Sequence, residues 1–142
     1  MTAIQPVPAQ ELLLQRPPFR FVDELVAYDE TSARTVFRVP EDGPLLENGV
    51  LCSSGLMEHM AQSCAARVGY LSYLRHIPPR IGFIAQIKAW ELFRFPKPGE
   101  WLETDIVVQY EMMGITLADV TVRSAGELMA RGQFKTILKE DD

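Results

Sequence analysis

The sequence has few cysteines and no long apolar run, and each absence narrows the class of protein. Its two cysteines, Cys52 and Cys64, lie on or beside one predicted helix, roughly 18 Å apart, which is too far for a disulfide bond. Buried thiols in a reducing compartment are therefore expected. No stretch approaches the ~20 apolar residues that span a bilayer, and the N-terminus lacks the basic-then-apolar pattern of a signal peptide. We expect a cytoplasmic protein with no membrane partner.

The sequence also lacks an excess of basic residues and any cluster of metal-binding side chains. Its 14 Lys and Arg stand against 19 Asp and Glu, which gives a formal net charge of -5. Because the basic residues are scattered, nucleic-acid binding is not expected. Two His and two Cys at these spacings form no metal-ligand set, and no nucleotide-binding loop is present. We therefore predict neither a metal nor another cofactor.

One long helix is predicted within residues 51–77, LCSSGLMEHMAQSCAARVGYLSYLRHI. Apolar or small side chains recur there at helical spacing, and β-branched residues are nearly absent. These positions are Met57, Met60, Ala61, Cys64, Val68 and Leu71. Ser53 or Ser54 is expected to cap the start, and Pro78 and Pro79 prevent continuation. At about 1.5 Å per residue, the helix would be roughly 33 Å long, enough to cross a small domain.

The rest of the chain is typical of β-strands. Strands are predicted over residues 19–28, 33–39, 80–95, 101–112, 115–123 and 128–138. Residues 1–10 are expected to be a leader and residues 139–142 a solvated tail. The length favours a single domain over residues 1–142, and a long amphipathic helix needs an apolar sheet to lie on. The prediction is α+β, with one long helix wrapped by a curved antiparallel sheet of about six strands.

Three blocks of sequence resemble the 3-hydroxyacyl-acyl-carrier-protein dehydratases of bacterial fatty-acid synthesis, the FabZ type. The blocks are LLQRPPFRFVD at residues 13–23, LMEHMAQ at residues 56–62 and KAWELFRFPKPGE at residues 88–100. They occur in the family's order and at about its distances. The resemblance implies a hotdog fold and a dimer, homomeric or heteromeric, with active-site tunnels between protomers. It also implies that the ligand is an acyl thioester on acyl carrier protein or CoA.

Only one of the two residues of the family's catalytic pair has a match in this sequence. That pair is a Glu on the helix and a His in the loop before it, with backbone N–H groups at the helix start binding the thioester oxygen. Glu58 matches the Glu and Gln62 the supporting Gln, which makes Glu58 the candidate acid/base. Pro44 stands where the family has its His, and Gln15 replaces the His of the opening motif.

Other residues are candidates for the remaining parts of the site. Ser53 and Ser54 occupy the helix start and are expected to bind the thioester oxygen. Glu47 and Asn48 lie in the loop that lacks the His and are candidate substitutes, although both also suit a turn. An acyl tunnel is expected to be lined by a group of apolar residues, each of which also suits simple core packing. They are Met57, Met60, Phe83, Ile84 and Trp90.

Neither histidine is expected to replace the missing one. His59 directly follows Glu58, so its side chain points about 100° away around the helix. We interpret it as a partly exposed or interface histidine. His76 lies some ~27 Å further along the axis and is interpreted as a partner of the helix C-terminal dipole.

Four functions remain open on the sequence. The first is a diverged dehydratase of fatty-acid or polyene and polyketide synthesis. The second is a non-catalytic or half-site subunit that completes its site with a His-bearing partner, as resemblance to proteins of aryl-polyene and flexirubin pigment clusters implies. The third is a hotdog thioesterase, which needs one carboxylate and an oxyanion hole. The fourth is an acyl-binding module without chemistry.

Overall fold

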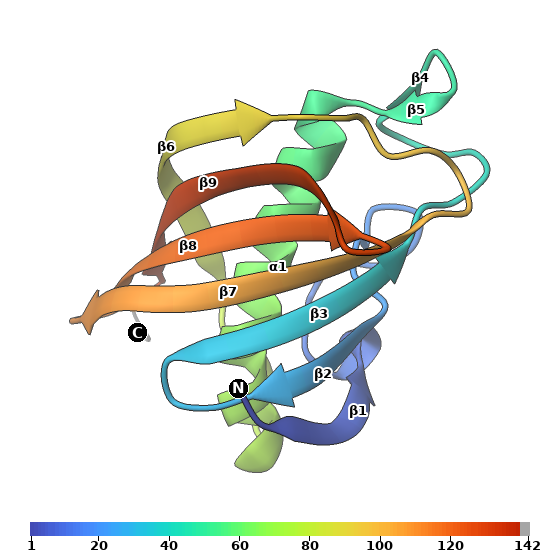
Figure 1. Cartoon of the computed structure of the whole chain (residues 1–142). Helices are drawn as coiled ribbons and strands as arrows, with labels where there is room; N and C mark the ends of the chain where they lie inside the picture. The colour runs from blue at the N-terminus through green and yellow to red at the C-terminus, as the bar shows by residue number, and fades with distance from the viewer. Residues whose placement is uncertain (140–142) are drawn as a thin grey trace.

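The fold is one long helix lying against the concave face of a curved antiparallel sheet (Figure 1). The structure is a computed structural model, and it describes residues 1–139. The α+β hotdog prediction is confirmed, with seven strands in the main sheet rather than about six. Within the described residues, no helix is both long and apolar enough to cross a membrane.

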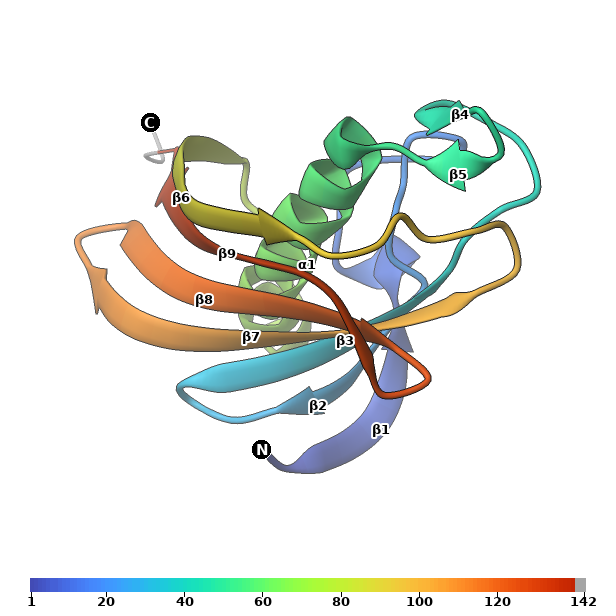
Figure 2. The same ribbon diagram turned by 45° about the horizontal axis from the view of Figure 1, so that its top comes forward.

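Within residues 1–139, five strands precede the helix and four long strands follow it. The elements are β1 (Ala3–Pro8), a 3-10 turn (Ala9–Glu11), β2 (Glu24–Tyr28), β3 (Ser32–Arg38), β4 (Leu46–Glu47), β5 (Val50–Leu51), α1 (Ser53–Leu74), β6 (Gly82–Leu92), β7 (Trp101–Met112), β8 (Ile115–Ser124) and β9 (Glu127–Leu138). The main sheet has the order β1-β2-β3-β7-β8-β9-β6, and β4 and β5 form a separate hairpin. Figure 2 shows β1 and β6 as the two edges of the sheet that bends around α1.

The prediction that residues 1–10 are a leader is wrong. Residues 3–8 form the edge strand β1, which pairs with β2 in the register Ala3 to Ala27 and Val7 to Leu25, with an irregularity between the two pairs. The two prolines in this segment obscured the strand, although Pro is tolerated on an edge strand, where no outer ladder bond is lost. At the other end, the Lys139 N–H donates to the Ile81 carbonyl, and the rest of the expected tail lies outside the described residues.

The start of α1 also differs from the prediction. Cys52 is the N-cap residue, and neither it nor a serine provides a side-chain cap in this part of the structure. The backbone on both sides of the cap is instead held by other segments. The Cys52 N–H donates to Leu45 O, and the Leu51 N–H donates to Pro96 O. Helix entry is therefore fixed by backbone bonds rather than by Ser53 or Ser54.

The core forms where the buried face of α1 meets the middle strands of the sheet. Its members are fully buried apolar side chains, among them Leu56, Met60, Ala66, Leu102, Ile106, Ala118, Val120 and Phe134. Polar groups join them and form hydrogen bonds, although the Arg67 Nε has no partner among the described residues. Ser63 Oγ lies 2.8 Å from Thr35 Oγ1, and Arg67 donates to the Glu111 carboxylate and to Glu30 O. These bonds fix the helix relative to β3 and β7.

Gly69 allows α1 to pack directly against the turn before residue 13. A Cβ at this position would clash with the backbone carbonyl of Leu12. At an ordinary position inside a helix, a Gly→Ala change raises the free energy of unfolding by about 1 kcal/mol. Here we expect Gly69→Ala to lower the free energy of unfolding by about 1–3 kcal/mol because backbone must move to relieve the overlap.

Urea unfolding of Gly69→Ala beside Ala65→Gly measures this effect. Ala65 is one turn away on the same helix, so its replacement reports the intrinsic preference for Ala over Gly and should cost about 1 kcal/mol. A Gly69→Ala protein that is more stable than the wild type would show that the two backbones are not in close contact.

Candidate active site

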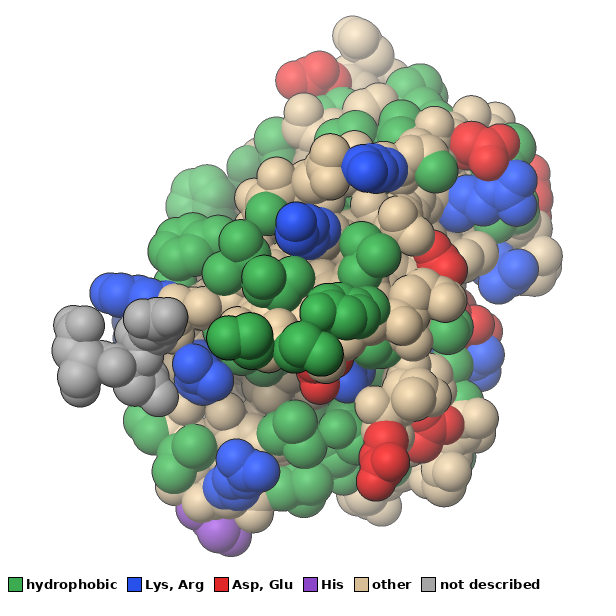
Figure 3. Space-filling model, turned by 90° about the vertical axis from the view of Figure 1, so that its left-hand side faces the viewer, with side chains coloured by type: hydrophobic (Ala, Val, Ile, Leu, Met, Phe, Trp, Pro, Cys, Tyr) green, Lys and Arg blue, Asp and Glu red, His purple; other side chains and the backbone are tan. Residues whose placement is uncertain are grey.

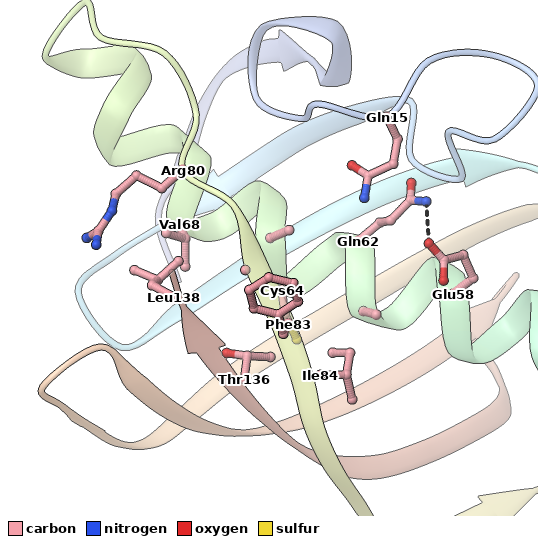
Figure 4. Close-up of a pocket in the computed structure, with 13 residues that line it drawn as sticks. Gln15, Glu58, Gln62, Cys64, Val68, Arg80, Phe83, Ile84, Thr136 and Leu138 are labelled. Atoms are coloured by element: carbon pink, nitrogen blue, oxygen red, sulfur yellow. Dashed lines mark hydrogen bonds between the residues drawn. The ribbon is translucent and has the colours of Figure 1, made fainter. Parts of the chain in front are cut away.

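A cavity of about 250 Å³ lies between α1 and the start of β6. Its lining comes from α1, β6, β9 and the loop at Gln15: Gln15, Glu58, Ala61, Gln62, Cys64, Ala65, Val68, Arg80, Gly82, Phe83, Ile84, Thr136 and Leu138. Figure 4 shows Glu58 and Gln62 at one end and Arg80 at the other, with apolar side chains between them. The cavity thus has apolar side chains between its ends, carries a carboxylate at one end and also includes the polar Gln15 and Thr136.

Glu58 and Gln62 face the cavity together because they are four residues apart on one helix. The Gln62 Nε2 donates to Glu58 Oε1 over 2.8 Å (Figure 4). Among the described residues, Gln62 is the one hydrogen-bond partner of this carboxylate. Oε1 therefore already accepts a hydrogen bond, so a proton on the carboxyl group is carried by Oε2.

The Gln62 amide has one orientation because its other partners fix it. Its Oε1 accepts the Phe21 N–H at 2.7 Å, and its Nε2 also donates to Phe19 O at 2.9 Å. A backbone N–H can only donate and a carbonyl can only accept, so a flipped amide would lose both bonds. The side chain is 2% exposed, which makes such a loss costly. Gln62 is therefore a rigid support for Glu58.

His59 is fully buried, so its interpretation as a partly exposed or interface histidine is wrong. Its Nδ1 donates to Phe21 O over 2.6 Å, because that oxygen can only accept. Its Nε2 then accepts from the Thr104 hydroxyl at 2.7 Å, and its ring stacks on Phe37 with centroids 5.4 Å apart. Burial lowers the pKa of His59 to about 4, which keeps the ring neutral. As expected, it does not line the cavity; the exposed His76, beyond the helix end, does not line it either.

Several candidates lie away from the cavity of this single chain. In the first turn of α1, Ser53 is half-buried and Ser54 is exposed, and neither residue lines the cavity. Glu47 and Asn48 are exposed at the turn of the β4–β5 hairpin. Within the chain, neither hairpin residue reaches the Glu58 cavity.

Among the described residues, the lining of the cavity contains one carboxyl group, that of Glu58, and no histidine. Burial raises the pKa of the Cys64 thiol to about 12, so it remains protonated. Residues 1–139 also contain no group of three His, Cys, Asp or Glu side chains that could hold a metal ion. Glu58 is therefore the candidate acid/base of this cavity.

The apolar lining agrees only in part with the expected tunnel. Phe83 and Ile84 line the cavity. Met60 is buried in the core, Trp90 packs against the core, and Met57 is half-buried; these three do not line the cavity. Ala61, Ala65 and Val68 also line the cavity and were not predicted to do so, although their spacing of three, seven and ten residues from Glu58 places them on its face of the helix. Gln15, which replaces the His of the family's opening motif, lines the cavity as well, and no sequence signal pointed to Thr136.

Three comparisons relate this chain to known proteins. The profile of the ApeP-like family, described as ApeP dehydratase, matches residues 7–142. An uncharacterized thioester dehydrase of Halalkalibacterium halodurans is 26% identical over 141 residues, covering 92% of this chain and 86% of the relative. The dehydratase heterocomplex ApeI:P from Xenorhabdus doucetiae contains a chain of similar fold, with a TM-score of 0.84, 16% identity, and coverage of 95% and 93%.

Similarity of fold extends to a second class of protein. A hypothetical thioesterase from Streptococcus pneumoniae, solved with coenzyme A, gives a TM-score of 0.65 with 13% identity. The matched region covers 83% of this chain and 86% of that one. At this identity the likeness concerns the fold alone.

The buried neutral His59 predicts a loss of stability at mildly acidic pH. Its pKa is near 6.5 in the unfolded chain and about 4 in the folded one, so below pH 6.5 the unfolded chain binds the additional proton. Stability is fully present above pH 6.5 and falls as the pH decreases toward 4. Between pH 6.5 and 5 we expect a loss of about 1.5 kcal/mol in urea unfolding.

Two controls isolate this contribution. The pKa values of Asp29 and Glu100 are lowered to about 2 by hydrogen bonds, chiefly from Ser32 and Arg94, so their stabilisation is lost mainly below pH 4.5. His59→Asn removes the titrating ring and should flatten the curve between pH 6.5 and 5. An unchanged slope in that variant would assign the pH dependence to other groups.

Proposed function

The chain belongs to the ApeP-like dehydratase family, and from this premise we propose that it acts in the dehydration of 3-hydroxyacyl thioesters as one half of a two-subunit active site. The observation that carries the proposal is a cavity whose described lining holds one carboxyl group, that of Glu58, fixed by a hydrogen bond, and no histidine or second carboxyl group. The reaction needs two proton-transferring groups.

Glu58 performs one of the two proton transfers. Dehydration removes a proton alpha to the thioester carbonyl and adds a proton to the departing hydroxyl, which leaves as water. With the proton on Oε2, Glu58 is the acid that protonates this hydroxyl. Gln62 occupies Oε1 and keeps the proton-bearing oxygen available to the substrate. The partner's histidine removes the alpha proton.

The sheet edge at β6 is the proposed contact with the partner. β6 pairs with β9 on one side and is the last strand in the sheet on the other. Phe83 is 57% exposed on this strand, and Ile84, Ile81 and Ile137 are also exposed nearby. Figure 3 shows hydrophobic side chains gathered on this side of the molecule among several Lys and Arg. A strand added to β6 would pair its free backbone groups and cover this apolar surface.

A partner at β6 also accounts for the missing histidine. Phe83 and Ile84 both line the cavity and lie on the edge strand, so a chain added there borders the Glu58 site. The solved ApeI:P heterocomplex supports a pair of unlike subunits. The substrate is an acyl group on acyl carrier protein or CoA, in fatty-acid or polyene synthesis. Its chain occupies the apolar part of the cavity, where each buried CH₂ contributes about 0.8 kcal/mol.

Dehydration of a 3-hydroxyacyl-carrier protein tests the proposal. The assay compares this chain alone, a His-bearing homologue alone and the purified complex of both. We expect the complex to be active and Glu58→Gln in this chain to lower kcat by about 100-fold or more, because acid/base groups typically contribute that much. Glu41→Gln, which changes an exposed carboxylate outside the cavity, should leave the rate unchanged.

Three results would contradict this function. If Glu58→Gln leaves the dehydration rate of the complex unchanged, this chain takes no part in the chemical step. Activity of the chain alone that disappears in Glu58→Gln would identify a dehydratase that needs no second kind of subunit. Release of free thiol without dehydration would identify a thioesterase, which needs only one carboxylate.

A further inference from the structure

Two buried side chains of α1 hold the backbone of Phe21 from both sides. The His59 Nδ1–H donates to Phe21 O, and the Phe21 N–H donates to Gln62 Oε1. Gln62 also donates to Phe19 O, so three bonds connect this short segment to the helix. The segment lies outside every strand, in the stretch between the 3-10 turn and β2. Its position next to α1 therefore depends strongly on these side chains.

Two residues of the main sheet hold the imidazole of His59 in place. Thr104, near the start of β7, donates its hydroxyl to Nε2, and the Phe37 ring of β3 stacks on the imidazole at an angle of 20°. A continuous series of contacts thus runs from Thr104 through His59 to Phe21. From Phe21 it continues through the Gln62 amide to the carboxylate of Glu58.

We propose that His59 is a positioning residue for Glu58, acting through the Phe21 backbone and the Gln62 amide. Without the bond from Nδ1, the Phe21 carbonyl is left unsatisfied in a buried place and the segment shifts to find another partner. The Phe21 N–H then moves away from Gln62, and Phe19 O moves with the same segment, so the amide loses the two backbone contacts that set its orientation. Glu58 loses its fixed hydrogen bond as a result. The catalytic part of this inference rests on the proposed function.

Asn and Gln at position 59 separate positioning from simple packing. The amide of Asn reaches about as far as Nδ1 and can donate to Phe21 O, whereas the longer Gln reaches about as far as Nε2 and favours Thr104. Both substitutions remove the ring that stacks on Phe37, so both should lower stability to a similar extent. Only His59→Asn preserves the contact that leads to Glu58.

Steady-state kinetics of the complex with a His-bearing homologue give the first test. We expect His59→Asn to stay within about threefold of the wild-type kcat and His59→Gln to lose about tenfold or more, with KM little changed, because displacement of a reacting group by an ångström costs up to 100-fold. If both variants lose kcat equally, or if the loss of kcat matches the loss of folded protein, His59 acts in packing alone and does not position Glu58.

Nuclear magnetic resonance of the Gln62 side-chain amide gives a test that does not require activity. The signal is assigned by its absence in Gln62→Met. Its shifts should be the same in wild type and His59→Asn and move toward the values of a free amide in His59→Gln. If these shifts occur but the wild-type complex does not dehydrate, the positioning holds and the proposed function fails. Identical amide shifts in all three proteins would overturn the positioning whatever the activity.

Discussion

The Gln62 amide is the constraint on which the site depends. Its oxygen faces the Phe21 N–H and its nitrogen faces Phe19 O and Glu58 Oε1, so one side chain joins the loop before β2 to the carboxylate in the cavity. The amide is almost completely buried, so none of these groups can exchange its partner for water at low cost. The direction of Glu58 is therefore set by the fold before any substrate binds.

The described lining of the cavity holds one fixed carboxylate and no histidine or second carboxyl group, which is why the two proton transfers are assigned to two subunits in the proposed function. The cavity opens between α1 and an edge strand, and the apolar side chains of that strand are exposed beside it. The same strand thus borders the incomplete site and offers free backbone groups. In the proposed function, one docking event at β6 covers the apolar surface and brings the partner's histidine to the Glu58 site.

The sequence predicted the elements whose pattern is local. The helix has nearly the expected limits, and residues 101–112 form β7 because the period of two was clear. Glu58 and Gln62 were expected in the site from the resemblance of LMEHMAQ to the dehydratase motif, whereas the hydrogen bond between them was not predicted. Long-range contacts were not readable: β1 was hidden by prolines, and the burial of His59 depends on Phe21, Phe37 and Thr104, which lie 22 to 45 positions away in the chain. The apolar residues of the helix likewise did not reveal that Met60 faces the core.

The most direct test of this account is a crystal structure of the chain in complex with a His-bearing homologue. The account predicts that β6 adds to the matching edge strand of the homologue and that the homologue's imidazole faces Glu58 across the cavity, close enough for one acyl thioester to contact both. A complex in which the two chains meet through other surfaces, or in which the imidazole opens onto a different cavity, would contradict it.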